Sequence, residues 1–247
     1  GGEDGQGGAA WGPGGGRAGG RRGRLRYWAA CSRRLANSVE AARQLALEFY
    51  GPMFLLYSVY DGAAQKETVT QLEVALPPFL VGFKCETNAG DLLRQSLIGE
   101  MASDVLLGDS SPLYQRLYDE GLINSSFGGG FDQLPGVAVL CAGGESGQPP
   151  AVSDATLEEA QRLEREGIDP DFFEQIRRAS FVATLRALHS FENISFSMAD
   201  GYFRGCDARR FPEAYASIEK ADVERFLREN LTDSRRAISI IEPKKEG

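Results

Sequence analysis

Histidine is almost absent from this chain, because among 247 residues only His189 carries an imidazole. A zinc site built on imidazoles needs two or three of them, so the chain cannot supply such a site by itself. A serine–histidine–acid site would have to use His189. The sequence therefore excludes most histidine-based chemistry before any motif is considered.

Closely spaced cysteines are missing as well. The four cysteines, Cys31, Cys85, Cys141 and Cys206, are scattered along the chain, and no CxxC pair occurs. This spacing excludes zinc-ribbon and thioredoxin-type sites. We expect buried free thiols in a reducing, cytoplasmic environment.

Long apolar runs are also missing. No stretch of 18 apolar residues occurs, and no basic segment followed by an apolar stretch opens the chain. We therefore expect no membrane span, no secretory signal and no membrane partner.

Charge is unevenly distributed. Residues 1–34 hold seven Arg and two acids, whereas the remainder holds 20 basic and 33 acidic residues, a net charge of −13. Half of residues 1–24 are Gly, a composition that predicts disorder. The Arg/Gly segment could act as an RNA-contacting arm. The acidic body argues against broad nucleic-acid binding, so a leader without that role is the preferred interpretation.

The rest of the chain alternates strand-like and helix-like segments. A helix is expected over 35–50, because Leu35, Val39, Ala42, Leu45 and Phe49 recur three or four residues apart. Further helices are expected over 91–107, 112–121, 153–166, 171–189 and 221–230. Strands are expected over 68–84, interrupted at Pro77-Pro78, and over 122–128, 131–142 and 236–242.

The order of these segments indicates an α+β fold, an antiparallel sheet covered by helices. We expect Gly128-Gly129-Gly130 to form a tight turn that makes its two flanking strands antiparallel. Three regions follow: a disordered segment 1–34, a helical remnant and linker 35–65, and one domain over 66–243. Residues 38–50 are weakly similar in sequence to residues 190–202. This similarity is what we expect if the helical remnant is the tail of a preceding copy of the same domain.

Several motifs resemble catalytic ones only superficially. Gly128-Gly129-Gly130 has no following Lys-Ser/Thr, so it is not a phosphate loop. Gly144-Glu145-Ser146-Gly147 lacks the spacing of a nucleophile elbow and is read as a turn. The acids Glu158, Glu159, Glu164 and Glu166 alternate with Arg162 and Arg165, which is typical of a solvated helix face.

Four strings together resemble insulinase/pitrilysin-type zinc peptidases, the family that includes mitochondrial processing peptidase. They are Leu-Pro-Pro-Phe-Leu-Val-Gly-Phe-Lys at 76–84, the stretch 108–127 around Gly121-Leu122, Gly-Ile-Asp-Pro-Asp at 167–171 with its continuation to 179, and Ala-Ile-Ser-Ile-Ile-Glu-Pro at 237–243. The resemblance is to the C-terminal, non-catalytic half and covers about 66–243. Within the family, the chain looks most similar to the bacterial branch, whose members work as two-protein pairs.

This resemblance implies repeated α+β domains that close a chamber around an unfolded peptide. In the family, an HxxEH helix of the first domain binds zinc and activates water. The string His189-Ser-Phe-Glu192-Asn193 has Asn193 in place of the second histidine. We therefore expect no catalytic residue, no metal site and no cofactor in this chain, with zinc only in a partner domain.

Many family members also use an Arg and a Tyr from the C-terminal half to hold the peptide carbonyl and the developing oxyanion. An alignment on Gly121-Leu122 puts these substrate-binding positions at Tyr118 and Asn124, so neither residue is retained. Arg116 is two residues away, on a different face of the expected helix.

The sequence thus predicts a non-catalytic C-terminal domain that helps to form a peptide-binding chamber and is inactive alone. Its partners would be an HxxEH-bearing domain or subunit and an unfolded peptide. The alternative is a structural or assembly subunit of the same fold with no peptidase role. Between Tyr60 and Val69 there is little room for the end of a complete first domain, which suggests truncation or a damaged reading frame upstream.

Overall fold

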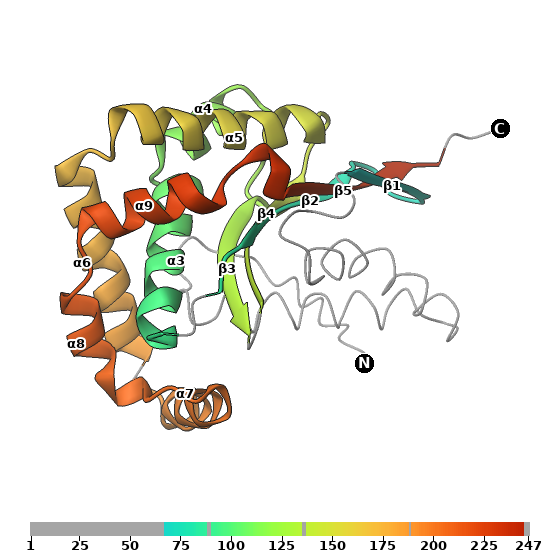
Figure 1. Ribbon diagram of the computed structural model, residues 1–247. Helices are drawn as coiled ribbons and strands as arrows, with labels where there is room; N and C mark the ends of the chain where they lie inside the picture. The colour runs from blue at the N-terminus through green and yellow to red at the C-terminus, as the bar shows by residue number, and fades with distance from the viewer. Residues whose placement is uncertain (1–66, 88–89, 135–136, 188, 245–247) are drawn as a thin grey trace, which may run out of the picture.

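The computed structural model describes residues 67–87, 90–134, 137–187 and 189–244. The predicted segments 1–34 and 35–65, including the helix expected over 35–50, lie outside these residues. The described part combines one sheet with a layer of helices (Figure 1). Its strands are β1 (Glu67–Leu72), β2 (Pro78–Cys85), β3 (Gly128–Leu134), β4 (Val137–Glu145) and β5 (Arg236–Pro243).

Most helices lie between β4 and β5 in the chain. The helices are α3 (Leu92–Leu107), α4 (Pro112–Asp119), α5 (Pro149–Glu166), α6 (Pro170–Ala187), α7 (Phe191–Arg204), α8 (Phe211–Ala216) and α9 (Lys220–Asn230). Two short 3-10 turns complete the set: η1 (Ala208–Arg210) lies between α7 and α8, and η2 (Asp233–Arg235) lies between α9 and β5. None of the described helices is long and apolar enough to span a membrane.

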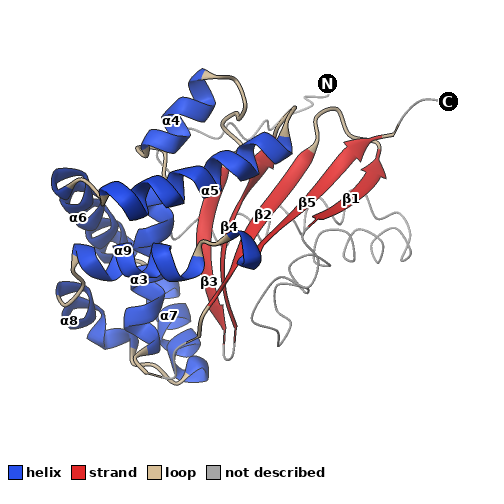
Figure 2. Ribbon diagram, turned by 45° about the horizontal axis from the view of Figure 1, so that its top comes forward, coloured by secondary structure: helices blue, strands red, loops and turns tan. Residues whose placement is uncertain are grey.

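The sheet has the strand order β1-β5-β2-β4-β3. The pairs β2–β4, β2–β5 and β3–β4 are antiparallel, and the edge pair β1–β5 is parallel. The α+β class is therefore confirmed, with one parallel edge that the sequence does not predict. Figure 2 shows the helices gathered beside β3 and across one face, with β1 at the far edge.

Helix α3 is the central element of the core. Leu97, Met101 and Val105 recur every four residues and are buried. The helix begins after Asp91, whose carboxylate accepts the Arg94 N–H, and ends at Gly108. Such caps are local signals, and for this reason the predicted bounds of this helix agree with the observed ones.

The predicted glycine turn is wrong. Gly128, Gly129 and Gly130 lie inside β3, paired with Gly143, Ala142 and Cys141 of β4. The preceding residues 122–127, expected to begin a strand, form turns and irregular backbone. A Gly run is a common turn signal, but here the glycine at 129 lets Leu107 of α3 approach the sheet, because a Cβ there would lie 2.5 Å from Leu107 Cδ1.

The helices after β4 also depart from prediction. Helix α5 begins at Pro149, earlier than the expected 153, because proline is accommodated in the first turn. The helix expected over 171–189 corresponds to α6, which ends at Ala187, and a separate helix, α7, begins at Phe191. Neither α7 nor α8 was predicted as a separate helix.

Candidate functional site

The end of α4 and the residues that follow it, 118–124, form a corner of the chain, called the α4 corner below. It contains Tyr118 and Asn124, the two positions to which the alignment assigns substrate binding. Gly121 has φ of 68°, in the left-handed region that favours glycine. The Leu122 N–H donates to Leu117 O and the Gly121 N–H donates to Tyr118 O, at 2.9 and 3.0 Å. This is a Schellman motif, so Gly121-Leu122 ends the helix and directs the chain toward β3.

Tyr118 lies on the outside of this corner. Its side chain is 53% exposed and stacks on Tyr114, with ring centroids 6.1 Å apart and planes 10° apart. Tyr114 in turn contacts the buried Phe127, which stacks on Phe79 of β2. This row of rings connects an exposed phenol to the core and limits the positions that Tyr118 adopts.

Asn124 is held inside the same corner. Its side-chain Oδ1 accepts the Ser126 N–H at 2.8 Å, and its Nδ2 donates to Glu145 Oε2 at 3.4 Å. The Glu145 N–H donates to Ser126 Oγ at 3.1 Å. Asn124 thereby fastens the loop to the end of β4, a contact that sequence reasoning missed because Glu145 is 21 residues away.

The chemistry of the corner differs from that of an arginine–tyrosine pair. Tyr118 offers a neutral hydroxyl, and burial, reinforced by the carboxylate of Asp109, raises the pKa of the adjacent Tyr114 above its ordinary value. Neutral donors orient a carbonyl but carry no positive charge to balance an oxyanion. Arg116, the nearby cation, is exposed in the last turn of α4. The corner therefore presents a phenol and an amide, with one exposed guanidinium nearby on α4.

The HxxEH-like string is not a metal-binding helix. His189 is exposed and precedes Ser190, the residue that caps α7 through the Asn193 N–H. In an HxxEH motif both imidazoles project from one helix, whereas His189 lies outside α7. Within the described ranges, no group of three His, Cys, Asp or Glu side chains could hold a metal ion.

The acidic residues of α5 are partly structural. Glu159 is buried and receives two hydrogen bonds from Arg162, at 2.7 and 3.0 Å. Glu166 also pairs with Arg162, and these hydrogen bonds raise the pKa of the guanidinium. Glu158 and Glu164 are exposed, so the predicted solvated face holds for them and is wrong for Glu159.

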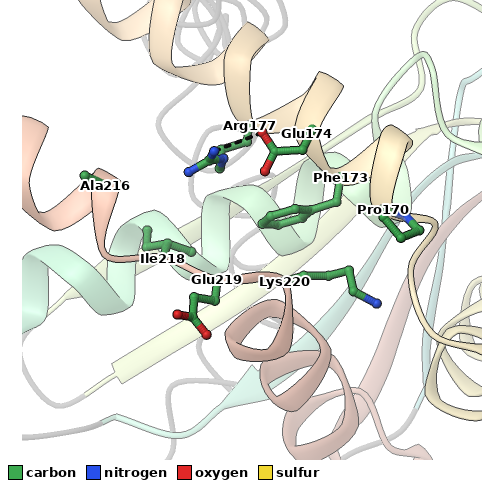
Figure 3. A pocket seen from close by; sticks show the side chains of 8 residues that line it. All are labelled: Pro170, Phe173, Glu174, Arg177, Ala216, Ile218, Glu219 and Lys220. Atoms are coloured by element: carbon green, nitrogen blue, oxygen red, sulfur yellow. Dashed lines mark hydrogen bonds and ion pairs between the residues drawn. The ribbon is translucent and has the colours of Figure 1, made fainter.

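A hollow of about 310 Å³ lies between α6 and the α8–α9 junction (Figure 3). Phe173 and Ile218 supply buried apolar surface, and Glu174 pairs with Arg177 at 2.9 Å. Lys220 donates to Ile168 O and to Glu224. Of the charged residues that line the hollow, Glu174, Arg177 and Lys220 are thus ion-paired, and the hollow lies apart from the α4 corner.

Comparison with known proteins agrees with this description. Residues 63–180 match the peptidase M16 inactive domain. Over 189 residues the chain is 25% identical to the uncharacterized zinc protease YmfH of Bacillus subtilis, covering 74% of this chain and 44% of that protein. The chain thus spans less than half the length of this curated relative.

Solved structures show the same fold. An M16-like peptidase of Alicyclobacillus acidocaldarius superposes with a TM-score of 0.69 and 21% identity, over 74% of this chain and 44% of that one. The inactive peptidase domain of a Bordetella parapertussis protein named as a zinc protease gives 0.59 and 17%, over 71% of this chain and 96% of that domain. The resemblance to insulinase/pitrilysin-type peptidases is therefore confirmed, since residues 63–180 match the inactive domain of the peptidase M16 family.

Proposed function

We propose that this chain is the non-catalytic half of a zinc peptidase, which forms one wall of a peptide-binding chamber opposite an HxxEH-bearing domain or subunit. The observation that carries the proposal is the match of 63–180 to an inactive M16 domain in a chain with a single histidine. Zinc and the water that it activates belong to the other half. This chain alone binds no zinc and cleaves no peptide.

The role of the α4 corner within this proposal is peptide holding. Tyr118 is half exposed, while its ring is stacked on Tyr114 and thereby oriented. An oriented phenol can donate a hydrogen bond to a main-chain carbonyl of an extended peptide. The Asn124 amide contacts Glu145, so it shapes the loop rather than the peptide.

The first experiment tests the partner. The full chain, tagged and isolated from its own cells, is analysed for stoichiometric partners by mass spectrometry and for zinc by elemental analysis. We expect an HxxEH-bearing polypeptide in equal amount and one zinc ion per complex. The complex cleaves an unfolded peptide, and a zinc chelator stops the cleavage. A zinc-free chain without such a partner contradicts the proposal.

The second experiment tests the corner. Tyr118→Phe keeps the stacked ring and removes the hydroxyl, so we expect the complex to bind an unfolded peptide about 2- to 10-fold more weakly, the value of one hydrogen bond. Arg116→Gln, which changes an exposed neighbour on α4, serves as the matched control and leaves affinity unchanged. Equal affinity of the Tyr118→Phe complex and the unsubstituted complex removes Tyr118 from the proposal.

A structural subunit without peptidase role is the second candidate. The observation that favours it is the replacement of the Arg and Tyr positions by Tyr118 and Asn124, which removes the charge that stabilises an oxyanion. The partner experiment separates the two, because a structural subunit assembles stoichiometrically with proteins that hold no zinc.

A further inference from the structure

The face of the sheet that points away from the helices, which we call the second face, is apolar. Strand β4 reads Val-Ala-Val-Leu-Cys-Ala at 137–142, and β5 reads Ala-Ile-Ser-Ile-Ile at 237–241. Near-continuous apolar runs are typical of strands buried on both faces, whereas a strand with one solvated face alternates apolar and polar residues. The second face therefore needs a cover as much as the helix side does.

The buried side chains form two clusters, one on each face. The cluster on the helix side joins Val81, Leu140 and Ile240 to residues of the helices. The cluster on the second face is centred on Val139 and Ala237, which are 0% and 4% exposed, and within the described ranges it includes strand residues alone. Because these two side chains are buried within a single chain, residues of the same chain must cover them.

The exposure of the edge strand β1 indicates the same cover. Val69 pairs with Ile240 and therefore lies on the helix side, yet it is 46% exposed. Thr70 pairs with Ile241 on the second face, where Thr70 is half-buried and Ile241 is 3% exposed. Exposure alternates in this sense along the whole of β1. At this edge the second face is thus covered more fully than the helix side.

One stretch outside the described ranges is long enough to supply the cover. Residues 1–66 precede β1, and each of the other gaps holds three residues or fewer. The Gly-rich residues 1–24 have few apolar side chains, whereas 35–50 have an apolar stripe at helical spacing, made of Leu35, Val39, Ala42, Leu45 and Phe49. We propose that residues 35–50 form an amphipathic helix whose stripe packs on the second face of the sheet.

The dimensions of the two parts agree with this packing. A helix over 35–50 has 16 residues and is about 24 Å long. Five strands spaced about 4.8 Å apart make a sheet roughly 20 Å wide. The 16 residues 51–66 connect the helix to β1 and span at most roughly 50 Å when extended. The connection therefore reaches every part of the second face.

Disulfide formation in the full chain tests this packing, because Cys141 lies on the second face beside Val139. Two cysteines are bridged only when their Cα atoms lie within about 7 Å. Single cysteines are introduced on the stripe, as Val39→Cys, Ala42→Cys or Leu45→Cys, and on the opposite side of the helix, as Gln44→Cys. After mild oxidation we expect peptide mapping to find Cys141 joined within one chain to at least one stripe position. Gln44→Cys is the matched control and forms no such bridge.

A charge on the stripe gives a second readout. Leu45→Asp places a carboxylate against the sheet, and Gln44→Asp places the same group on the opposite side, one residue earlier. We expect Leu45→Asp to raise the rate at which iodoacetamide modifies Cys141 at least about tenfold, because an unpaired carboxylate drives the helix off an apolar face. Gln44→Asp leaves this rate unchanged. Cys85, on the helix side, is the internal reference and stays unmodified in both variants.

Three outcomes overturn the packing: no bridge from any stripe position, a bridge from Gln44→Cys as readily as from the stripe, or a Cys141 rate that Leu45→Asp does not change. Bridges found only between two chains assign the second face to another copy, and protection of Cys141 only in the presence of the HxxEH-bearing partner assigns it to the catalytic half. Neither measurement has a proteolytic readout, so failure here leaves the proposed peptidase role untouched, and failure of that role leaves the packing standing.

Discussion

Single residues decide what chemistry this domain offers. At the α4 corner, the alignment on Gly121-Leu122 predicts that the guanidinium and the phenol of the family's pattern are replaced by the phenol of Tyr118 and the amide of Asn124. This alignment requires only local sequence. It does not anticipate that Asn124 contacts Glu145, because that contact depends on how β4 returns beside the loop.

Cys85 provides a prediction at this scale. Its thiol is 3% exposed, and burial raises the pKa of Cys85 to about 12. The thiolate is the reactive form, so the thiol stays protonated throughout the range from neutral to pH 9. We expect iodoacetamide to leave Cys85 unmodified in the native chain, as measured by peptide mapping.

Cys141 and Cys206 supply the comparison in the same sample. Both are only half-buried, so they are expected to react faster than Cys85. After denaturation all three are expected to react alike. Native labelling of Cys85 at the rate of Cys141 would show that the strand β2 opens readily or that its burial is incomplete.

At the scale of elements, predictions succeed where the signal is local. Helix α3, bounded by Asp91 and Gly108, agrees with the expected range 91–107, and α6, whose first turn is capped by Asp169, begins within one residue of the expected 171. Helix α7 is different, because its largest apolar side chains lie outward. A search for a buried apolar stripe assumes the reverse, and so it does not separate α7 from α6.

Substitutions at two neighbouring glycines of β3 test whether residues 128–130 form a strand and not a turn. Gly129→Ala places a methyl group 2.5 Å from Leu107 Cδ1, and we expect it to lower the free energy of unfolding by about 1–3 kcal/mol through overpacking. Gly128→Ala is the matched control, because nothing lies within 4 Å of its added Cβ. Urea denaturation measures both, and a similar small change in each would favour the turn that the sequence suggested.

At the scale of the whole molecule, Asp222 connects elements distant in sequence. Its carboxylate accepts hydrogen bonds from Arg94 of α3, 128 residues away, and from Arg225. Burial raises the pKa of Asp222, but the Glu219 N–H and the Arg94 guanidinium outweigh it, so the pKa is below its ordinary value. The ionised form is therefore favoured in the folded state.

Asp222→Asn should consequently destabilise the fold in a pH-dependent way. A lowered folded-state pKa contributes stability above the unfolded value of about 3.9, and this contribution is lost as pH falls through the folded pKa. We expect a loss of about 1.5–3 kcal/mol at neutral pH, the range for a hydrogen bond to a charged group. The difference from the unsubstituted chain should shrink below about pH 4.

Thermal or urea unfolding at several pH values measures this difference. Glu164→Gln, which removes an exposed carboxylate of α5, is the control and should change stability little at any pH. If the free energy of unfolding of Asp222→Asn stays lower than that of the unsubstituted chain by the same amount down to pH 2, then the shape of the Asp222 side chain, and not its charge, stabilises the fold.

The sequence by itself determined the α+β class, most helix ends and the missing zinc ligands. These follow from caps, side-chain periodicity and residue counts, which act over a few positions or need no geometry at all. Only the tertiary structure decided the parallel pairing of β1 with β5, the glycine run as a strand and the outward aromatic side of α7. Each depends on contacts between distant segments, and such contacts leave no periodic trace in the local sequence.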